Sequence, residues 1–317
     1  MHCPSRHRFL DSALATSVVA GLGALAGVGP LFAAPAASAP LLTRPIPSSG
    51  EQLPVIGAGT SGSYDVAIGS PEYAQLQQVA KIFFDGGARL IDTSPNYGRS
   101  DEVVGSLLHD GGWRDKAFIA TKIAADSRQA AEAQWAESLH RLRTDKVELL
   151  QVHNLRDWQN QLAYARELKA QGKTKYVGVT HYTDAGLPEL ERILRGEKLD
   201  FIQIHYSVNS TGAAQTVLPL AQDKGVAVII NRAFDDGKLF AMVKDVPLPA
   251  WAAEAGVTSW AQMFLKFAIS HPAVTVVIPA TGKPHRQADN LKGGQLQEGK
   301  RSLLTQAQQD ELVAMFR

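Results

Sequence analysis

The sequence predicts a (β/α)8 TIM barrel, the α/β fold in which eight parallel strands close into one sheet inside a ring of helices. Eight short apolar runs alternate with amphipathic stretches over residues 50–317, and no long linker or low-complexity tract interrupts them. Asp92, Lys122 and His153 end three successive runs, 30 and 31 residues apart. Because a strand–helix–strand unit takes roughly 30 residues, we expect consecutive parallel strands. One barrel domain should cover residues 40–317.

The expected strands are short, rich in Ile and Val, and flanked by Gly, Pro, Asp or Asn, which is typical of buried parallel strands. They lie near residue 55 and at 88–93, 117–123, 147–153, 176–180, 201–205, 226–231 and 274–278. Helices are expected between them at 72–84, 129–142, 158–170 and 260–269, with a final helix from Thr305. Thr258 or Ser259 can cap the fourth helix, and Gly172 is the expected stop of the third.

Residues 1–39 have the layout of an export signal, with a short basic start, an apolar stretch over 13–34 and small residues at the end. The sequence favours cleavage after Ala36, because Pro40 would hinder cleavage after Ala39. The start resembles a twin-arginine signal with His7 at the second arginine, so the twin-arginine export machinery is an expected partner. We expect a periplasmic or secreted protein without stable membrane association. The alternative is an uncleaved anchor, because about 20 apolar residues span a bilayer.

Composition excludes several other classes of function. The 317 residues carry a net charge of +1 with no block of like charges, so nothing favours a nucleic acid or an anionic membrane surface as partner. The single cysteine, Cys3, lies inside the signal. The mature chain therefore has no thiol nucleophile, thiol ligand or disulfide.

Four polar residues form the candidate catalytic site: Asp92, Tyr97, Lys122 and His153. The carboxyl ends of barrel strands meet at one rim, where such folds place their chemistry. A lysine that ends a buried strand needs a partner, and Asp92 on the neighbouring strand can supply one, although a purely structural ion pair would look the same. Pro95 helps to form a turn that lifts Tyr97 over this rim.

A phenol beside an ammonium should have a pKa below its usual value near 10, which would make Tyr97 a proton donor. His153 could donate a hydrogen bond to a carbonyl. Taken alone, Tyr97 could be an ordinary turn residue and His153 a satisfied core histidine. Together, without metal-ligand spacing or a nucleophile, they favour carbonyl reduction with hydride from a cofactor.

These residues resemble the aldo-keto reductase family, in which Asp-x-x-x-x-Tyr, Lys and His end consecutive barrel strands. The resemblance covers nearly all of residues 48–292. It implies a barrel that binds NADPH without a Rossmann fold and transfers hydride to a small aldehyde or ketone. It also implies that Tyr97 is the general acid, that Lys122 and Asp92 tune it, and that His153 orients the substrate.

Residues 277–291 are similar to the family segment that binds the phosphate and adenine of the cofactor. The resemblance assigns Thr281 and Arg286 to the 2′-phosphate, Asn290 to the adenine, Gln203 to the nicotinamide amide and Phe234 to the nicotinamide ring. The full set of cofactor-binding residues that it implies is Thr60, Thr180, His181, Gln203, Phe234, Ile278, Thr281, Arg286 and Asn290.

The chain departs from the family pattern at the cofactor. Ala280 stands where the family has a lysine that contacts phosphate, and Lys283 could compensate. The resemblance implies NADPH, and the replaced lysine leaves NADH as an alternative. Asp235 and Asp236 fall beside the expected pyrophosphate and should repel it unless they point to solvent or meet Arg232.

Ser61 and Asn154 replace the tryptophans that often wall the family's substrate pocket, so we expect an open and polar pocket. One alternative function is a nicotinamide-nucleotide-binding regulatory module with little turnover. Another is a barrel hydrolase or lyase using Asp92 and His153, but a second carboxylate at a suitable strand end is missing.

Overall fold

Eight parallel strands form the centre of the protein, and the (β/α)8 prediction is confirmed. The computed structural model describes residues 39–317, so the predicted signal and its cleavage site lie outside the described residues. Each strand pairs with the next in sequence order. The strands are β3 (Ala58–Gly59), β4 (Leu90–Asp92), β5 (Phe118–Ile123), β6 (Val147–Val152), β7 (Thr174–Thr180), β8 (Phe201–His205), β9 (Ala227–Asn231) and β10 (Val274–Val277).

Backbone hydrogen bonds between the first and last strands close the barrel. Gly57 N–H donates to the Val277 carbonyl at 2.8 Å, and Val277 N–H donates to the Val55 carbonyl at 2.9 Å. Gly59 N–H donates to Pro279 O at 3.1 Å. A Cβ on Gly57 would lie 2.9 Å from the Leu90 carbonyl oxygen, so only glycine fits this close approach. All eight expected strands are present, within a few residues of their predicted positions.

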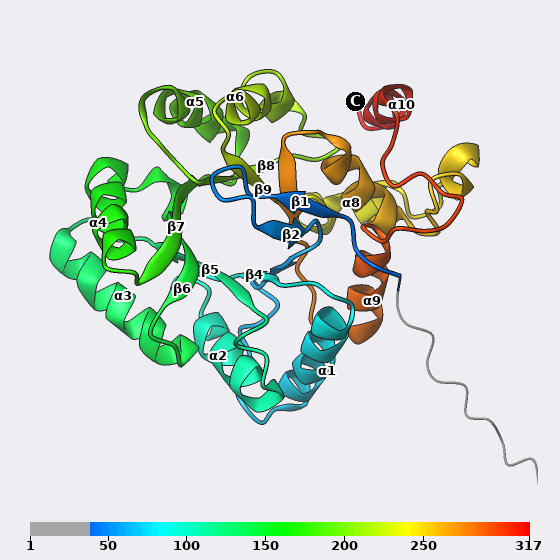
Figure 1. The fold of residues 1–317 in the computed structure, drawn as a ribbon. Coiled ribbons are helices and arrows are strands. Elements are labelled where there is room, and N and C mark those ends of the chain that lie inside the picture. Colours follow the sequence, from blue (N-terminus) through cyan, green and yellow to red (C-terminus); the bar gives the residue numbers. More distant parts are fainter. Residues whose placement is uncertain (1–38) are drawn as a thin grey trace, which may run out of the picture. The chain divides into compact units, whose positions relative to one another are not determined.

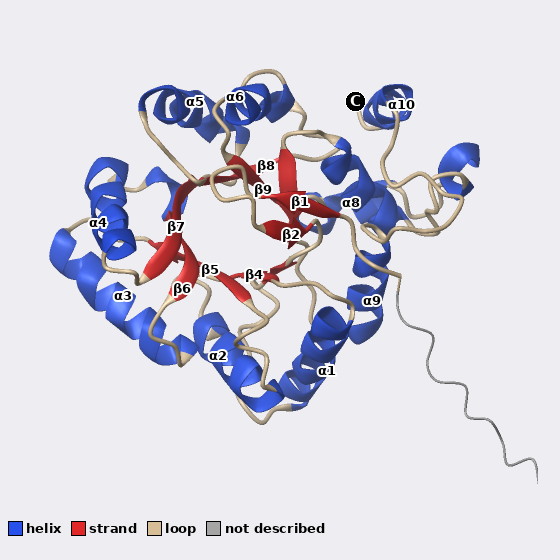
Figure 2. Ribbon diagram, viewed as in Figure 1, coloured by secondary structure: helices blue, strands red, loops and turns tan. Residues whose placement is uncertain are grey.

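Helices surround the barrel on the outside (Figure 2). They are α1 (Pro71–Asp85), α2 (Ser100–Gly111), α3 (Arg128–Leu142), α4 (Trp158–Ala170), α5 (Leu187–Gly196), α6 (Val217–Asp223), α7 (Lys238–Met242), α8 (Trp260–Ser270), α9 (Pro284–Lys292) and α10 (Gln306–Met315). The helices predicted at 72–84, 129–142, 158–170 and 260–269 correspond to α1, α3, α4 and α8. Ser259, not Thr258, caps α8 by accepting a hydrogen bond from Gln262 N–H. No helix within residues 39–317 has the length and apolarity needed to cross a bilayer.

A β-hairpin plugs the amino-terminal end of the barrel. Strands β1 (Thr43–Pro45) and β2 (Gln52–Pro54) pair antiparallel and lie across the middle of the ring in Figure 1. Ile46 and Leu53 of this hairpin are fully buried against the barrel interior, which contains the rings of Phe118, Tyr176 and Phe201. The hairpin thus covers this end of the barrel with buried apolar side chains, and the cavity lies at the opposite end.

Candidate functional site

Two adjoining cavities lie at the carboxyl ends of the strands. The first, of about 830 Å³, is lined by nine residues predicted from the sequence: Thr60, Asp92, Tyr97, His153, Thr180, Gln203, Phe234, Ile278 and Arg286. The second, of about 470 Å³, adds Thr281 and Asn290. Phe234, Phe240, Ala280 and Arg286 line both cavities. The two cavities therefore adjoin, with the predicted catalytic residues at the first and the predicted phosphate and adenine residues at the second.

The predicted Asp92–Lys122 ion pair is confirmed and lies below the first cavity. Lys122 Nζ donates to Asp92 Oδ2 at 2.6 Å and to the Thr93 carbonyl at 2.8 Å, and both charged side chains are almost fully buried. Asp92 Oδ1 accepts from Gln203 Nε2 at 2.7 Å and from Gln151 Nε2 at 3.3 Å. A buried charge is tolerable only with such partners. The pair joins the ends of β4 and β5, and the two glutamines extend it to β6 and β8.

Lys122 keeps its proton at neutral pH. Burial is the largest effect and works to lower the pKa of Lys122, but Asp92, Tyr97 and Asp101 together outweigh it and raise that pKa above the ordinary value. The result is a fixed positive charge directly under the tyrosine.

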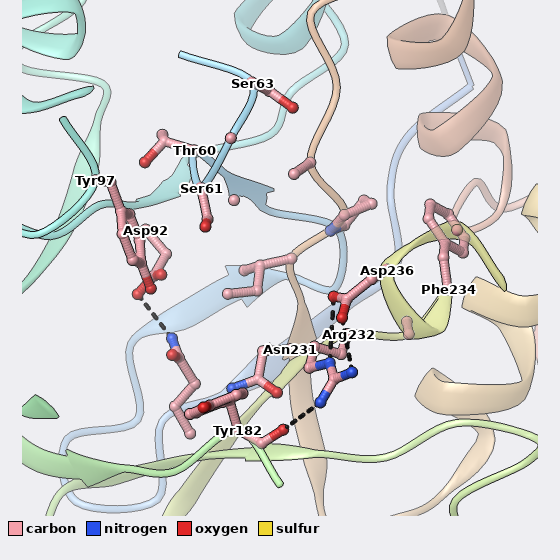
Figure 3. Close-up of a pocket in the computed structure, with 18 of the residues that line it drawn as sticks. Thr60, Ser61, Ser63, Asp92, Tyr97, Tyr182, Asn231, Arg232, Phe234 and Asp236 are labelled. Atoms are coloured by element: carbon pink, nitrogen blue, oxygen red, sulfur yellow. Dashed lines mark hydrogen bonds and ion pairs between the residues drawn. The ribbon is translucent and has the colours of Figure 1, made fainter. Parts of the chain in front are cut away.

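Tyr97 sits over this charge, as predicted. Its backbone N–H donates to the Ser94 carbonyl at 3.0 Å, which closes the turn after β4. Lys122 Nζ lies 5.2 Å from the centre of the phenol ring. The ring meets His153 edge to face, with centroids 5.7 Å apart. In Figure 3, Tyr97 and Asp92 lie together on one side of the cavity.

The predicted lowering of the Tyr97 pKa is wrong. Burial of the ring raises the pKa of Tyr97; the charge of Lys122 works against this rise, and the charge of Asp92 adds to it. The ammonium is half of a neutral pair, so its effect on the phenol is partly cancelled. Tyr97 therefore holds its proton firmly at neutral pH.

His153 follows β6 and is neutral at physiological pH. Burial, assisted by the charge of Lys122, lowers the pKa of His153 to about 3. Its Nδ1 atom lies 3.2 Å from the buried Ser94 Oγ. The residue is 7% exposed and lines the first cavity, where a neutral imidazole can donate one hydrogen bond.

Three of the eight buried side-chain polar atoms that lack a hydrogen-bond partner within residues 39–317 belong to residues that line the cavities. Thr60 Oγ1 and Asn231 Oδ1 in the first cavity, and Asn290 Nδ2 in the second, make no hydrogen bond. Such atoms are rare in folded proteins, because an unmade buried hydrogen bond is costly. Gln203 must donate to the acceptor-only Asp92 carboxylate, which leaves its Oε1 oxygen for another group. These atoms fit a polar ligand that extends along both cavities.

Arg232 forms ion pairs with both aspartates of the loop after β9, one of the two arrangements expected to prevent repulsion of the pyrophosphate. Arg232 Nη2 contacts Asp235 Oδ1 at 3.0 Å and Asp236 Oδ2 at 2.7 Å. Arg232 Nη1 donates to the Tyr182 carbonyl at 3.0 Å, so the guanidinium bridges two loops (Figure 3). Both carboxylates are therefore paired before any anion binds.

Two side chains that were predicted near the cofactor are held by local partners. His181 does not line either cavity; its Nδ1 atom accepts from Thr183 N–H at 3.2 Å, and its ring packs against Gly186. Lys283 donates to Gln75 Oε1 at 3.0 Å instead of standing in for the lysine replaced by Ala280. In both cases a local partner holds the side chain elsewhere.

Four site residues were missed by sequence reasoning: Ser94, Gln151, Asn231 and Phe240. Asn231 ends β9 just as Asp92 ends β4, so the same strand-end rule could have found it. Gln151 is a polar residue inside a buried strand and was a comparable signal. No sequence pattern indicated that Ser94 would contact His153.

Comparisons with known proteins agree with this geometry. The family model described as "Aldo/keto reductase family" matches residues 55–305. Methylglyoxal reductase YeaE of Escherichia coli is 30% identical over 248 residues, which cover 74% of this chain and 84% of that protein. Aldo-keto reductase YhdN of Bacillus subtilis is 29% identical over 213 residues, which cover 61% of this chain and only 62% of that protein. A Klebsiella pneumoniae aldo-keto reductase solved with NADPH has a TM-score of 0.70 at 23% identity, covering 84% of this chain and 92% of that one.

The buried neutral His153 predicts an acid-sensitive stability. Its pKa is about 3 in the folded protein against 6.5 ordinarily, so between these values only the unfolded chain binds the proton. This contribution to stability is complete above the ordinary pKa and is lost as the pH falls towards 3. In urea unfolding series, His153→Gln should reduce the loss of stability between pH 7 and pH 4 by roughly 2–3 kcal/mol.

His285→Gln is the matched control, because His285 lies exposed on α9. It should keep the pH profile of the wild type. Equal losses of stability in wild type and His153→Gln would contradict a buried, neutral imidazole.

Proposed function

The chain belongs to the aldo/keto reductase family of oxidoreductases. We propose that it reduces an aldehyde or ketone to an alcohol with NADPH, using Tyr97 as the proton donor. One observation carries the proposal: Tyr97 stands at the first cavity directly over the buried Lys122–Asp92 pair. A proton donor with a fixed cation behind it suits an oxygen that gains negative charge during the reaction.

The two cavities fit a nicotinamide dinucleotide. Gln203 Oε1 and Asn231 Oδ1 can accept from the nicotinamide amide, Phe234 offers a ring face, and Asn290 Nδ2 can donate to the adenine. When bound, the cofactor supplies the hydride. Arg286 lines both cavities and is the cation placed to hold a phosphate.

The catalytic residues then have separate tasks. His153, neutral at physiological pH, donates a hydrogen bond that orients the substrate carbonyl. Tyr97 keeps its proton until negative charge grows on the carbonyl oxygen, and then transfers it. The Lys122 ammonium, 5.2 Å from the ring centre, stabilises the phenolate that remains. Asp92 keeps Lys122 charged and correctly placed, because an unpaired buried ammonium would lose its proton.

The substrate is proposed to be a small polar carbonyl compound. The mouth of the first cavity presents Ser61, Asn96, Asn154 and Tyr182, and no tryptophan is among the residues that line this cavity. A polar rim of this kind offers hydrogen bonds to hydroxyl or second carbonyl groups. Methylglyoxal, the substrate in the name of the Escherichia coli relative, and aldoses are the first probes.

Coenzyme selection is proposed to depend on Arg286. Ala280 is exposed at the junction of the two cavities and provides no charge there, and Lys283 is held by Gln75. A single guanidinium should therefore carry most of the preference for NADPH over NADH. NADH remains an alternative hydride source at lower affinity.

We also propose that residues 1–39 are an export signal and that the mature protein is periplasmic or secreted. The basic start, the apolar stretch over 13–34 and the small residues before Ala36 support this proposal. Intact mass measurement of protein from the exported fraction should give a chain that begins at Ala37. A full-length chain that sediments with membranes would instead favour the anchor.

Tyr97→Phe should abolish most of the turnover. Removing a positioned proton donor costs roughly 100-fold or more in kcat, whereas the cofactor cavity keeps its contacts. Cofactor absorbance decay with methylglyoxal measures turnover, and fluorescence titration with NADPH measures binding. The variant should lose kcat by at least about 100-fold and keep the wild-type Kd for NADPH.

Tyr164→Phe, on α4 outside both cavities, is the control and should behave as wild type. Retained kcat in Tyr97→Phe would refute the assigned role. Tight NADPH binding by the wild type with negligible turnover over a broad carbonyl panel would favour the regulatory module.

Arg286→Met should weaken NADPH binding about 10- to 100-fold and change NADH binding little, because a charge-assisted hydrogen bond to phosphate contributes about 1.5–3 kcal/mol. Fluorescence titration with each coenzyme measures both Kd values. Lys283→Met is the neighbouring control and should leave both unchanged. An equal loss of affinity for NADPH and NADH would mean that Arg286 does not read the 2′-phosphate.

A further inference from the structure

Ser94 connects the two catalytic side chains that flank the expected carbonyl. It is fully buried in the turn after β4, and its carbonyl accepts from Tyr97 N–H at 3.0 Å. Its hydroxyl oxygen lies 3.2 Å from His153 Nδ1 and accepts from Asn96 N–H at 3.3 Å. One serine therefore positions the backbone of Tyr97 and touches the ring of His153.

The direction of the Ser94–His153 hydrogen bond follows from an account of donors and acceptors. A serine hydroxyl has one proton and two lone pairs. Asn96 N–H occupies one lone pair, and His153 Nδ1 is the sole acceptor within reach of the proton among the described contacts of Ser94. If His153 Nδ1 carried a proton, the buried Ser94 proton would have no acceptor, which buried polar groups rarely tolerate. Ser94 therefore donates to Nδ1.

We propose that Ser94 is a positioning residue that holds His153 in the Nε2–H tautomer. The inference rests on the proposed function, since it concerns the group that orients the carbonyl. Neutral imidazole has one N–H and one lone pair, and the hydrogen bond made by one nitrogen decides the role of the other. With Nδ1 occupied as an acceptor, Nε2 has the proton.

The tautomer matters because a carbonyl oxygen needs a donor. The low pKa of His153 means that the ring has no second proton at physiological pH. An Nδ1–H tautomer would leave a lone pair on Nε2, which would repel the substrate oxygen instead of binding it. Loss of a correct tautomer can remove most of the activity of a histidine-dependent site.

Nitrogen-15 NMR of histidine-labelled protein tests the tautomer without any turnover. The two ring nitrogens of neutral imidazole have distinct shifts, and the signals of His153 are identified by their loss in His153→Gln. In the wild type we expect Nε2 protonated and Nδ1 unprotonated. In Ser94→Ala we expect a mixture or a switch to Nδ1–H. Ser94→Thr keeps a hydroxyl and should restore the wild-type pattern.

Kinetics give the second readout. Ser94→Ala should lower kcat/KM for methylglyoxal roughly tenfold, the size of one hydrogen bond, while the Kd for NADPH stays unchanged. Ser270→Ala is the matched control: Ser270 is also buried and also makes two hydrogen bonds, to Lys266 O and Leu304 N, but it lies on α8 outside both cavities. It should change neither the His153 shifts nor kcat/KM.

Three results would each overturn the inference: a wild-type His153 protonated on Nδ1, an unchanged tautomer in Ser94→Ala, or a changed tautomer with wild-type kcat/KM. Failure of the proposed function looks different. A wild type without carbonyl turnover would refute the reductase activity, whereas the NMR result would still decide which nitrogen Ser94 occupies.

Discussion

The buried ion pair of Lys122 and Asp92 is the constraint on which the site depends. An unpaired charged lysine inside an apolar barrel would be strongly destabilising. Lys122 therefore donates to Asp92 and to the Thr93 carbonyl. Gln151 and Gln203 complete the carboxylate's hydrogen bonds. Four strands thereby share one polar network over a core that is otherwise apolar. Removing one partner would leave an uncompensated buried charge, which is costlier than the absence of both.

The same pair explains why Tyr97 rests protonated. The Lys122 ammonium alone would lower the pKa of Tyr97. The Asp92 carboxylate next to it cancels much of this effect, so burial of the ring decides the result and the pKa of Tyr97 is raised. The arrangement is still suited to proton donation. A cation that is buried and fixed in advance would need no reorganisation if Tyr97 gave up its proton as we propose, and this preorganisation is the usual source of electrostatic catalysis.

The sequence predicted the barrel well, because buried parallel strands have a strong compositional signal and their spacing is regular. It also located Asp92, Lys122 and His153, since residues at the ends of neighbouring parallel strands must meet. It missed the plugging hairpin and the helices α2, α5, α6 and α7. Of these, α6 and α7 have only seven and five residues, which is too short for a clear periodic pattern. The direction of individual side chains could not be predicted either. Thr183, two residues along the chain, holds the ring of His181, and no sequence pattern predicts such a rotamer.

Backbone strain is concentrated at the rim where these side chains act. Seven non-glycine residues of the described chain have positive φ, and six of them follow β6 or β9: Asn154, Leu155, Asp157, Arg232, Asp235 and Asp236. Each such conformation costs about 1–3 kcal/mol and persists only where the surroundings enforce it. After β9, Arg232 enforces it by pairing with both aspartates. The guanidinium thus has two effects, because it holds a strained loop against the cavity and neutralises carboxylates that would otherwise repel a phosphate-bearing ligand.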